Sequence, residues 1–233
     1  MAPPTHNPLV PDAGDAGTRL RLIEAAGPVF ARAGFADATV REIVAAAGAN
    51  VAAVNYHFGD KMGLYKAVLQ HYTRASIAAH PVTPPGFEKA DAETRLRAFV
   101  GAFVNRLFDE GKPAWMSQMI TREMTAPTEA FHDLVQSHMR PQIDTLRRII
   151  HELTGLPEGD VRVQRCAASV IAQCVNYKLC AAAHKVLSPL QTYDPPGKAA
   201  LAAHITAFSL AGIAAIRDES ASPSIRTPGS TRP

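Results

Sequence analysis

The sequence contains few of the features that mark secreted or disulfide-stabilised proteins. Its 233 residues include three cysteines, Cys166, Cys174 and Cys180, which show no C-x-x-C spacing and have no second cluster. Neither a disulfide framework nor a zinc site is therefore expected. The first seventeen residues contain no Lys or Arg and no apolar run. No signal peptide is expected for this reason, and the protein is predicted to be cytoplasmic.

One uncharged stretch has the length of a membrane span. Residues 199–216 carry no formal charge over eighteen positions, which meets the length criterion for a transmembrane helix. Small and polar residues make up much of this stretch, so its insertion into lipid would be only weakly favourable. We therefore expect a helix packed between protein surfaces and no membrane partner.

Alternating patterns that favour β-strands are nearly absent. Ala, Leu, Arg, Glu and Gln fill long segments with helical spacing, which predicts an all-α fold. Three prolines and a glycine within residues 80–86 cannot continue a helix and are interpreted as a domain boundary. Pro141 is expected to kink the helix that contains it. Later helices are expected near 89–110, 113–124, 127–153, 160–187 and 196–218.

Two short helices are predicted in the N-terminal part, after a first helix over residues 18–33. Thr39 and Glu42 form a capping box that marks the start of the second helix. Asn50 is placed to cap a third, short helix over residues 51–57. Two short helices joined by a glycine-containing turn are typical of a helix-turn-helix, whose second helix enters the DNA major groove.

The excess positive charge lies in this N-terminal part. Residues 18–74 carry seven basic and four acidic side chains, a net charge of +3, and the whole chain also has a formal charge of +3. The remainder of the chain is therefore balanced. A positive excess beside a helix-turn-helix favours contact with nucleic-acid phosphates.

The N-terminal run over residues 18–69 resembles the tetracycline-repressor (TetR) family. It contains F-A-x-x-G-F at residues 30–35, T-x-x-x-I at residues 39–43 and Y-x-F-x-x-K-x-x-L-Y at residues 56–65. Residues 120–150 resemble the CecR-type subgroup of that family. The resemblance implies a three-helix DNA-binding domain followed by a larger helical domain for ligand binding and dimerisation.

The resemblance also implies where DNA is contacted. Thr39 and Lys61 are candidate phosphate ligands, and Arg41 is expected at a base or the backbone. Polar recognition-helix side chains can bond base edges or phosphates, and alanines there can contact a thymine methyl group. The alternative for Tyr56 is a place in the core of a small helical domain, and the alternative for Lys61 is a solvated position at the start of a helix. The predicted DNA-binding residues are Thr39, Arg41, Asn50, Ala52, Ala53, Asn55, Tyr56, His57 and Lys61.

The second domain shows no pattern of catalytic or metal-binding residues. No G-x-S-x-G, H-E-x-x-H or P-loop motif occurs in the sequence. His132 and His138 flank Asp133, but six positions along a helix place them on roughly opposite faces. We therefore predict no catalytic residue, no metal and no cofactor.

Methionine and phenylalanine side chains are frequent on neighbouring predicted helices of the second domain. Unbranched methionine adapts to varied shapes and suits a pocket for an apolar effector, although an ordinary core is the more usual explanation for most of these residues. Polar residues that interrupt apolar faces would then supply hydrogen bonds to the effector. The predicted pocket residues are Phe103, Trp115, Gln118, Met119, Arg122, Phe131, His138, Gln173, Asn176 and Tyr177.

Together these features predict a homodimeric repressor that a small hydrophobic or aromatic effector releases from a palindromic double-stranded operator. Dimerisation is expected through the last two helices, 160–187 and 196–218. A helical scaffolding or architectural protein without sequence-specific DNA binding, and an enzyme, are the alternatives. The predicted domains are a disordered tail over 1–17, the DNA-binding domain over 18–80, the effector-binding and dimerisation domain over 81–219, and a disordered tail over 220–233.

Overall fold

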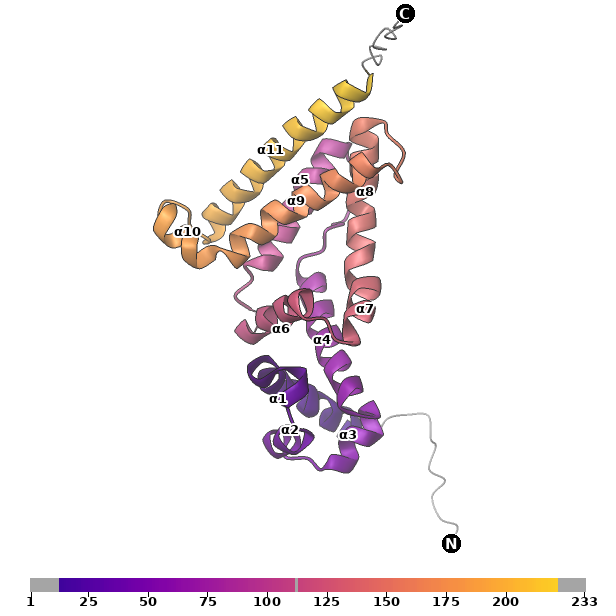
Figure 1. The fold of residues 1–233 in the computed structure, drawn as a ribbon, viewed down its shortest axis with the longest axis vertical. Coiled ribbons are helices and arrows are strands. Elements are labelled where there is room, and N and C mark those ends of the chain that lie inside the picture. Colours follow the sequence, from indigo (N-terminus) through magenta and orange to yellow (C-terminus); the bar gives the residue numbers. More distant parts are fainter. Residues whose placement is uncertain (1–12, 112, 222–233) are drawn as a thin grey trace, which may run out of the picture. The chain divides into compact units, whose positions relative to one another are not determined.

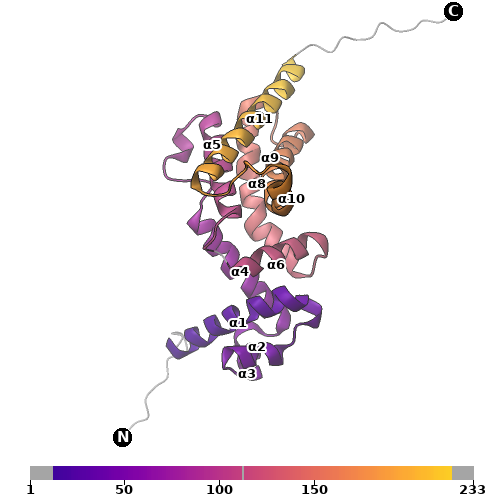
Figure 2. The same ribbon diagram turned by 90° about the vertical axis from the view of Figure 1, so that its left-hand side faces the viewer.

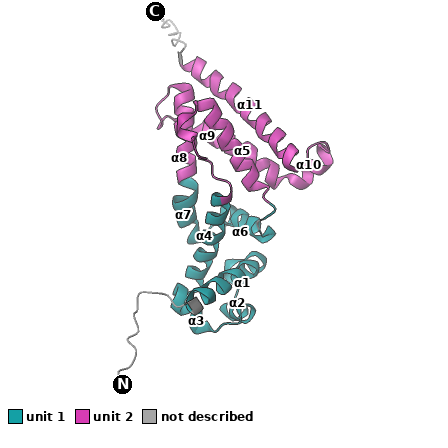
Figure 3. Cartoon of the chain, turned by 180° about the vertical axis from the view of Figure 1, so that it is seen from behind, with its two compact units in different colours: residues 1–78, 110–140 teal, residues 79–109, 141–233 magenta. Residues whose placement is uncertain are grey.

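The computed structural model describes residues 13–111 and 113–221. Of the tails predicted over 1–17 and 220–233, residues 1–12 and 222–233 lie outside this range, and residues 220–221 belong to the last helix. Within the described residues every regular element is a helix (Figure 1), which confirms the all-α prediction. The chain divides into two compact units (Figure 3). The first holds the chain up to Ala78 together with Glu110–Arg140, and the second holds Ala79–Asp109 together with the chain from Pro141 onward.

The first unit combines the N-terminal helices with two later ones. The segment 110–140, which we expected in the second domain, belongs to the first unit together with the N-terminal helices. The views in Figures 1 and 2 both show α2 and α3 beside α1. The elements are α1 (Ala13–Asp37), α2 (Val40–Ala47), α3 (Val51–Phe58), α4 (Lys61–Ala79), α6 (Ala114–Thr125), α7 (Ala130–Leu134) and a π-helical turn (Val135–Met139).

The two short helices begin at the residues that the sequence predicts. The Thr39 hydroxyl accepts a hydrogen bond of 3.2 Å from the Glu42 amide, and the Asn50 side chain accepts one of 2.9 Å from the Ala53 amide. These caps satisfy amides that have no partner within a helix. Gly48 ends α2 in the left-handed conformation at φ +59°, which glycine adopts without steric cost.

The first helix begins earlier than predicted. It starts at Ala13, so residues 13–17, expected in a disordered tail, are helical. Gly34 breaks the helix as predicted, with a non-helical φ of +81°, and a short helical segment up to Asp37 follows the kink. The amide of Ala38 then donates to the Gly34 carbonyl at 3.2 Å.

The helix predicted over residues 127–153 is interrupted. The π-helical turn Val135–Met139 separates α7 from α8 (Arg140–Thr154). Pro141 has no amide hydrogen to donate to the carbonyl of Ser137, and a wider turn accommodates its ring. The kink that Pro141 predicts is therefore present as a π-helical turn.

The second unit is built around a separate apolar core. Leu96, Phe99, Ile149, Val163 and Ile205 are fully buried there. Two helices from distant parts of the sequence, α5 (Ala92–Leu107) and α9 (Val161–Leu179), pack against the last helix, α11 (Pro195–Ala221). The elements of this unit are a short 3₁₀ helix (Phe87–Lys89), α5 (Ala92–Leu107), α8, α9 (Val161–Leu179), α10 (Ala181–Leu187) and α11 (Pro195–Ala221).

The predicted helix over residues 160–187 is divided into α9 and α10, which meet at a bend of 76°. None of the residues of α10 is buried. The last helix, α11, is long and apolar enough to cross a membrane by length and composition. Its side chains Leu201, Ile205 and Ile213 are buried in the core of the second unit, whereas Phe208 on the other side is exposed. A second protein surface on that side stays a prediction.

Candidate nucleic-acid interface and ligand cavity

One face of α3 is turned away from the core of the first unit. Val54 is fully buried, whereas 46% of Val51 and 75% of Tyr56 is exposed. Ala52 and Asn55 are exposed on the same side, because residues three or four positions apart share a helix face. This face offers a carboxamide, a phenol and two small apolar groups, which are the group types that read base edges in a major groove.

Residues around α2 extend this exposed face. Thr39 and Arg41 are exposed, as is Asn50 at the start of α3. The side-chain oxygens of Thr39 and Asn50 are occupied by capping, which leaves the hydroxyl hydrogen of Thr39 and the amide hydrogens of Asn50 as donors. Donors of this kind suit phosphate oxygens.

Two predicted DNA contacts lie on the inner side of α3 instead. The His57 side chain is 7% exposed, and its Nε2 lies 3.4 Å from the Asp15 carboxylate on α1. Ala53 is half-buried and packs against the core. The helical residues before Thr18, which we did not predict, place Asp15 beside His57. Val51, which we did not single out, takes the place of Ala53 on the exposed face.

Lys61 is bound to the end of α1. Its Nζ donates to the carbonyls of Ala36 and Ala38, at 3.1 Å and 3.0 Å, and lies 4.6 Å from the centre of the Phe35 ring. An ammonium group has three hydrogens, so two are used within the protein. One hydrogen is left, and the phosphate contact that we predicted for Lys61 stays a prediction.

Three predicted pocket residues attach α6 to the first unit. Met119 is 2% exposed within that core. The Trp115 ring packs edge-on against Tyr72 at 4.7 Å, and a Cβ atom at Gly27 would come within 2.2 Å of it. The Arg122 guanidinium donates to the Phe30 carbonyl at 3.3 Å. These side chains hold helices of the first unit together.

The remaining predicted pocket residues are scattered. Gln118 is exposed and Phe131 is half-buried on α7. Phe103 stacks on Phe99 in the second unit, with 6.1 Å between ring centres. His138 is buried in the first unit, where burial and the charge of Arg74 lower the pKa of its imidazole.

A buried polar contact that was not predicted joins α4 to α6. Glu123 is fully buried and accepts a hydrogen bond of 2.7 Å from the Tyr65 hydroxyl. The Thr128 amide donates to the same carboxylate at 3.1 Å. No local pattern indicates this pair, because Tyr65 and Glu123 are far apart in the sequence.

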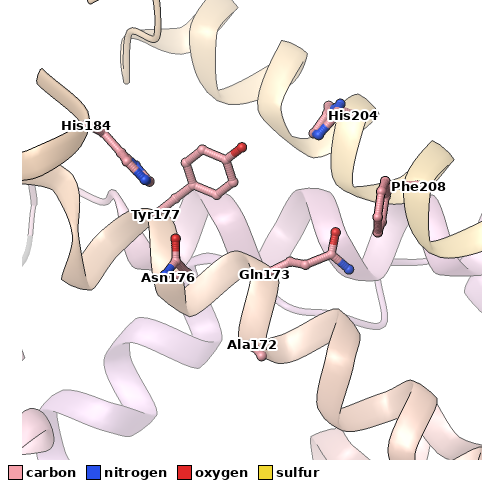
Figure 4. Close-up of a pocket in the computed structure, with 7 residues that line it drawn as sticks. All are labelled: Ala172, Gln173, Asn176, Tyr177, His184, His204 and Phe208. Atoms are coloured by element: carbon pink, nitrogen blue, oxygen red, sulfur yellow. The ribbon is translucent and has the colours of Figure 1, made fainter. Parts of the chain in front are cut away.

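Gln173, Asn176 and Tyr177 do come together, in a cavity of about 420 Å³ between α9, α10 and α11 (Figure 4). The bend after Leu179 brings His184 of α10 to the same cavity. The two histidines of the lining were not predicted, because neither proline nor glycine marks the bend. The complete lining consists of Ala172, Gln173, Asn176, Tyr177, His184, His204 and Phe208.

Comparison with known proteins identifies both parts of the chain. Residues 22–68 match the family described as bacterial regulatory proteins, tetR family, and residues 92–213 match the C-terminal domain of the HTH-type transcriptional dual regulator CecR. The HTH-type transcriptional dual regulator CecR of Shigella flexneri is 30% identical over 184 residues, which cover 75% of this chain and 81% of that protein.

Solved structures share the fold. A tetR-family regulatory protein from Rhodococcus RHA1 has a TM-score of 0.62 at 22% identity, covering 84% of this chain and 96% of that one. The TetR family transcriptional regulator PfmR from Thermus thermophilus has a TM-score of 0.55 at 18% identity, covering 82% and 97%.

These matches confirm the two resemblances drawn from the sequence. The relatives are transcriptional regulators and not enzymes, so the enzyme alternative is set aside. The exposed face belongs to α3, which is the second helix of the helix-turn-helix that this family uses to bind DNA. The chain therefore belongs to the TetR family of bacterial transcriptional regulators and carries a C-terminal domain of the CecR type.

Proposed function

We propose that the protein is a homodimeric, cytoplasmic repressor that leaves a palindromic operator when a small hydrophobic or aromatic effector binds. The observation that carries the proposal is the exposed face of α3, where Asn55 and Tyr56 stand clear of a helix whose Val54 is fully buried. A dimer with two-fold symmetry would present two such faces to half-sites about 34–36 Å apart, or a multiple of that distance.

Support for the homodimer comes from α9 and α11. Phe208 is 66% exposed on α11, and Ala203, Ala207 and Ala211 are exposed on the same side. The opposite side of α11 is buried through residues such as Ile205. An exposed aromatic residue among alanines allows close approach of a second copy, and a large exposed apolar surface favours an interface.

Coupling between effector and DNA is proposed to run through α6. Arg122 of α6 donates to the Phe30 carbonyl of α1, and Glu123 accepts from Tyr65 of α4. A displacement of α6 would therefore act directly on two helices of the DNA-binding unit. An effector can shift such an equilibrium only through its different affinity for the two states. Typical couplings of about 1–3 kcal/mol would lower operator affinity roughly 5–150-fold.

The experiment is footprinting of the DNA that flanks the gene, repeated with a panel of hydrophobic and aromatic compounds. We expect protection of a near-palindromic site and loss of protection with at least one compound. Uniform or absent protection would favour the scaffolding alternative. Because the CecR relative is named a dual regulator, transcription from the protected promoter is tested for both repression and activation.

A further inference from the structure

The first turns of α1 contact the last turn of α3, and the two helices lie side by side in Figures 1 and 2. The Asp15 carboxylate lies 3.4 Å from His57 Nε2, and the Arg19 guanidinium lies over the Phe58 ring, 5.2 Å from its centre. Both α1 residues precede residue 22, where the match to the tetR-family model begins. These contacts are therefore additional to the segment that the family model matches.

The short helix α3 depends on tertiary contacts for its orientation. It has eight residues, and an isolated helix of that length is not stable in water, so its direction is set by the surfaces against which it packs. The Asn50 cap fixes its first turn, and the buried Val54 fixes its middle. His57 lies in the last turn, which Asp15 contacts from α1.

His57 connects Asp15 to the exposed face of α3. Only 7% of the His57 side chain is exposed, and its ring packs edge-on against the Tyr56 ring, with 5.0 Å between the ring centres. Tyr56 itself is 75% exposed. A carboxylate attracts the hydrogen of a ring nitrogen, so Asp15 restricts rotation of the imidazole. The imidazole in turn limits the positions that the Tyr56 ring can occupy.

We infer that Asp15 is a positioning residue for DNA recognition, because through His57 it fixes the Tyr56 side chain and the last turn of α3 before DNA binds. A negative charge close to DNA by itself repels the phosphates. The positioning role and the charge effect therefore predict opposite changes in affinity when the carboxylate is neutralised. The orientation of α3 stands by itself, whereas its consequence for an operator rests on the proposed function.

Operator affinities of full-chain variants separate the two explanations. Asp15→Asn removes the charge and keeps the size of the side chain, and we expect its affinity for the footprinted duplex to fall roughly two- to tenfold, as for one lost polar contact. Asp15→Glu retains the carboxylate and should bind more tightly than Asp15→Asn. The matched control is Glu24→Gln, which removes the same charge at an exposed position of α1 and should not weaken binding. Affinity of Asp15→Asn equal to or above that of the parent overturns the inference.

A double-mutant cycle shows whether Asp15 acts through the exposed face of α3. Tyr56→Ala removes the side chain that the contact positions, and the fold should be retained because Tyr56 is 75% exposed. In that background Asp15→Asn should cause a smaller loss of operator affinity than in the parent, since coupled residues are not additive. Losses that add in full would show that Asp15 acts on stability alone, which overturns the inference.

Hydrogen exchange of the free chain tests the contact without DNA. The Gly59 amide donates to the Asn55 carbonyl at 3.0 Å and closes the last turn of α3. Asp15→Asn should raise amide exchange over residues 55–59 at least roughly twofold, with α4 and α6 unchanged. Unchanged exchange over residues 55–59 overturns the inference. Raised exchange in a variant whose parent protects no DNA supports the orientation of α3 by Asp15 and contradicts only the proposed function.

Discussion

The Tyr65 hydroxyl donates a hydrogen bond of 2.7 Å to the fully buried carboxylate of Glu123, which joins α4 to α6. The amide and the hydroxyl of Thr128 donate to the same carboxylate. A buried carboxylate is tolerated only where donors satisfy its oxygens. This contact therefore ties the turn after α6 to the interior of the first unit.

Removal of the Tyr65 hydroxyl should destabilise the protein. Tyr65→Phe keeps the ring, which packs edge-on against Phe30 at 4.8 Å, and removes one donor from a buried carboxylate. We expect a loss of about 1–3 kcal/mol in the free energy of unfolding, measured by urea denaturation. Tyr56→Phe is the matched control, because Tyr56 is 75% exposed. An equal effect of the two substitutions would contradict the role of the contact.

The same pair should make stability depend on alkaline pH. Burial, and then the hydrogen bond to Glu123, raise the pKa of Tyr65 above its ordinary value of 10.0. The unfolded chain therefore loses this proton first, so the stabilisation is complete below pH 10.0 and declines as the pH rises further. The difference in unfolding free energy between the parent and Tyr65→Phe should shrink progressively as the pH rises above about 10. Parallel curves would show that Tyr65 titrates alike in both states.

Lys61 should act mainly by holding the end of α1. Lys61→Met removes two hydrogen bonds to the Ala36 and Ala38 carbonyls and should cost about 1–2 kcal/mol of stability. If Lys61 also contacted a phosphate, Lys61→Met would reduce the logarithmic slope of operator affinity against salt concentration by about 0.9. We expect weaker binding with a nearly unchanged slope. A logarithmic slope that is smaller by about 0.9, with an unchanged free energy of unfolding, would support the phosphate contact predicted from the sequence.

The exposed α3 residues should have separable effects on DNA binding. Asn55→Ala should relax preference at one base position and cost about 1–3 kcal/mol of operator affinity, whereas Tyr56→Phe should weaken binding to all sequences. Competition with single-base operator variants measures both effects. The assignment of Asn55 as a base reader fails if its alanine variant discriminates between bases as the parent does.

Phe208→Glu should yield monomers. The side chain is 66% exposed, so folding should be retained while a charge is placed on the proposed interface. Sedimentation measures the mass, and the variant should also lose operator binding because two half-sites must be held together. Arg97→Glu, at an exposed position of α5, controls for charge. A stable Phe208→Glu dimer would place the interface elsewhere.

Local signals predicted the DNA-binding helices well. Caps depend on residues two or three positions away, so Thr39 and Asn50 located α2 and α3 from the sequence alone. The inward positions of His57 and Lys61 depend on both ends of α1, which are distant in sequence. Helical spacing could not reveal those partners.

The second half of the chain was less predictable for related reasons. Met119 has the spacing of a buried residue, but periodicity does not say which core a helix joins, and α6 joins the first unit. Met119→Arg would consequently disrupt a core and not fill a pocket. The bend at Cys180 lacks a proline or glycine, so the cavity that it helps to form had no local sequence signal.

The most direct test of the account is the equilibrium affinity of the full chain for its footprinted duplex, compared with a shuffled duplex of the same length and composition at one salt concentration. A sequence-specific regulator should prefer the operator by about 10³-fold or more, with two chains per duplex. The preference should collapse in Asn55→Ala combined with Tyr56→Phe. Equal affinity of the parent for both duplexes would contradict recognition through the exposed face of α3.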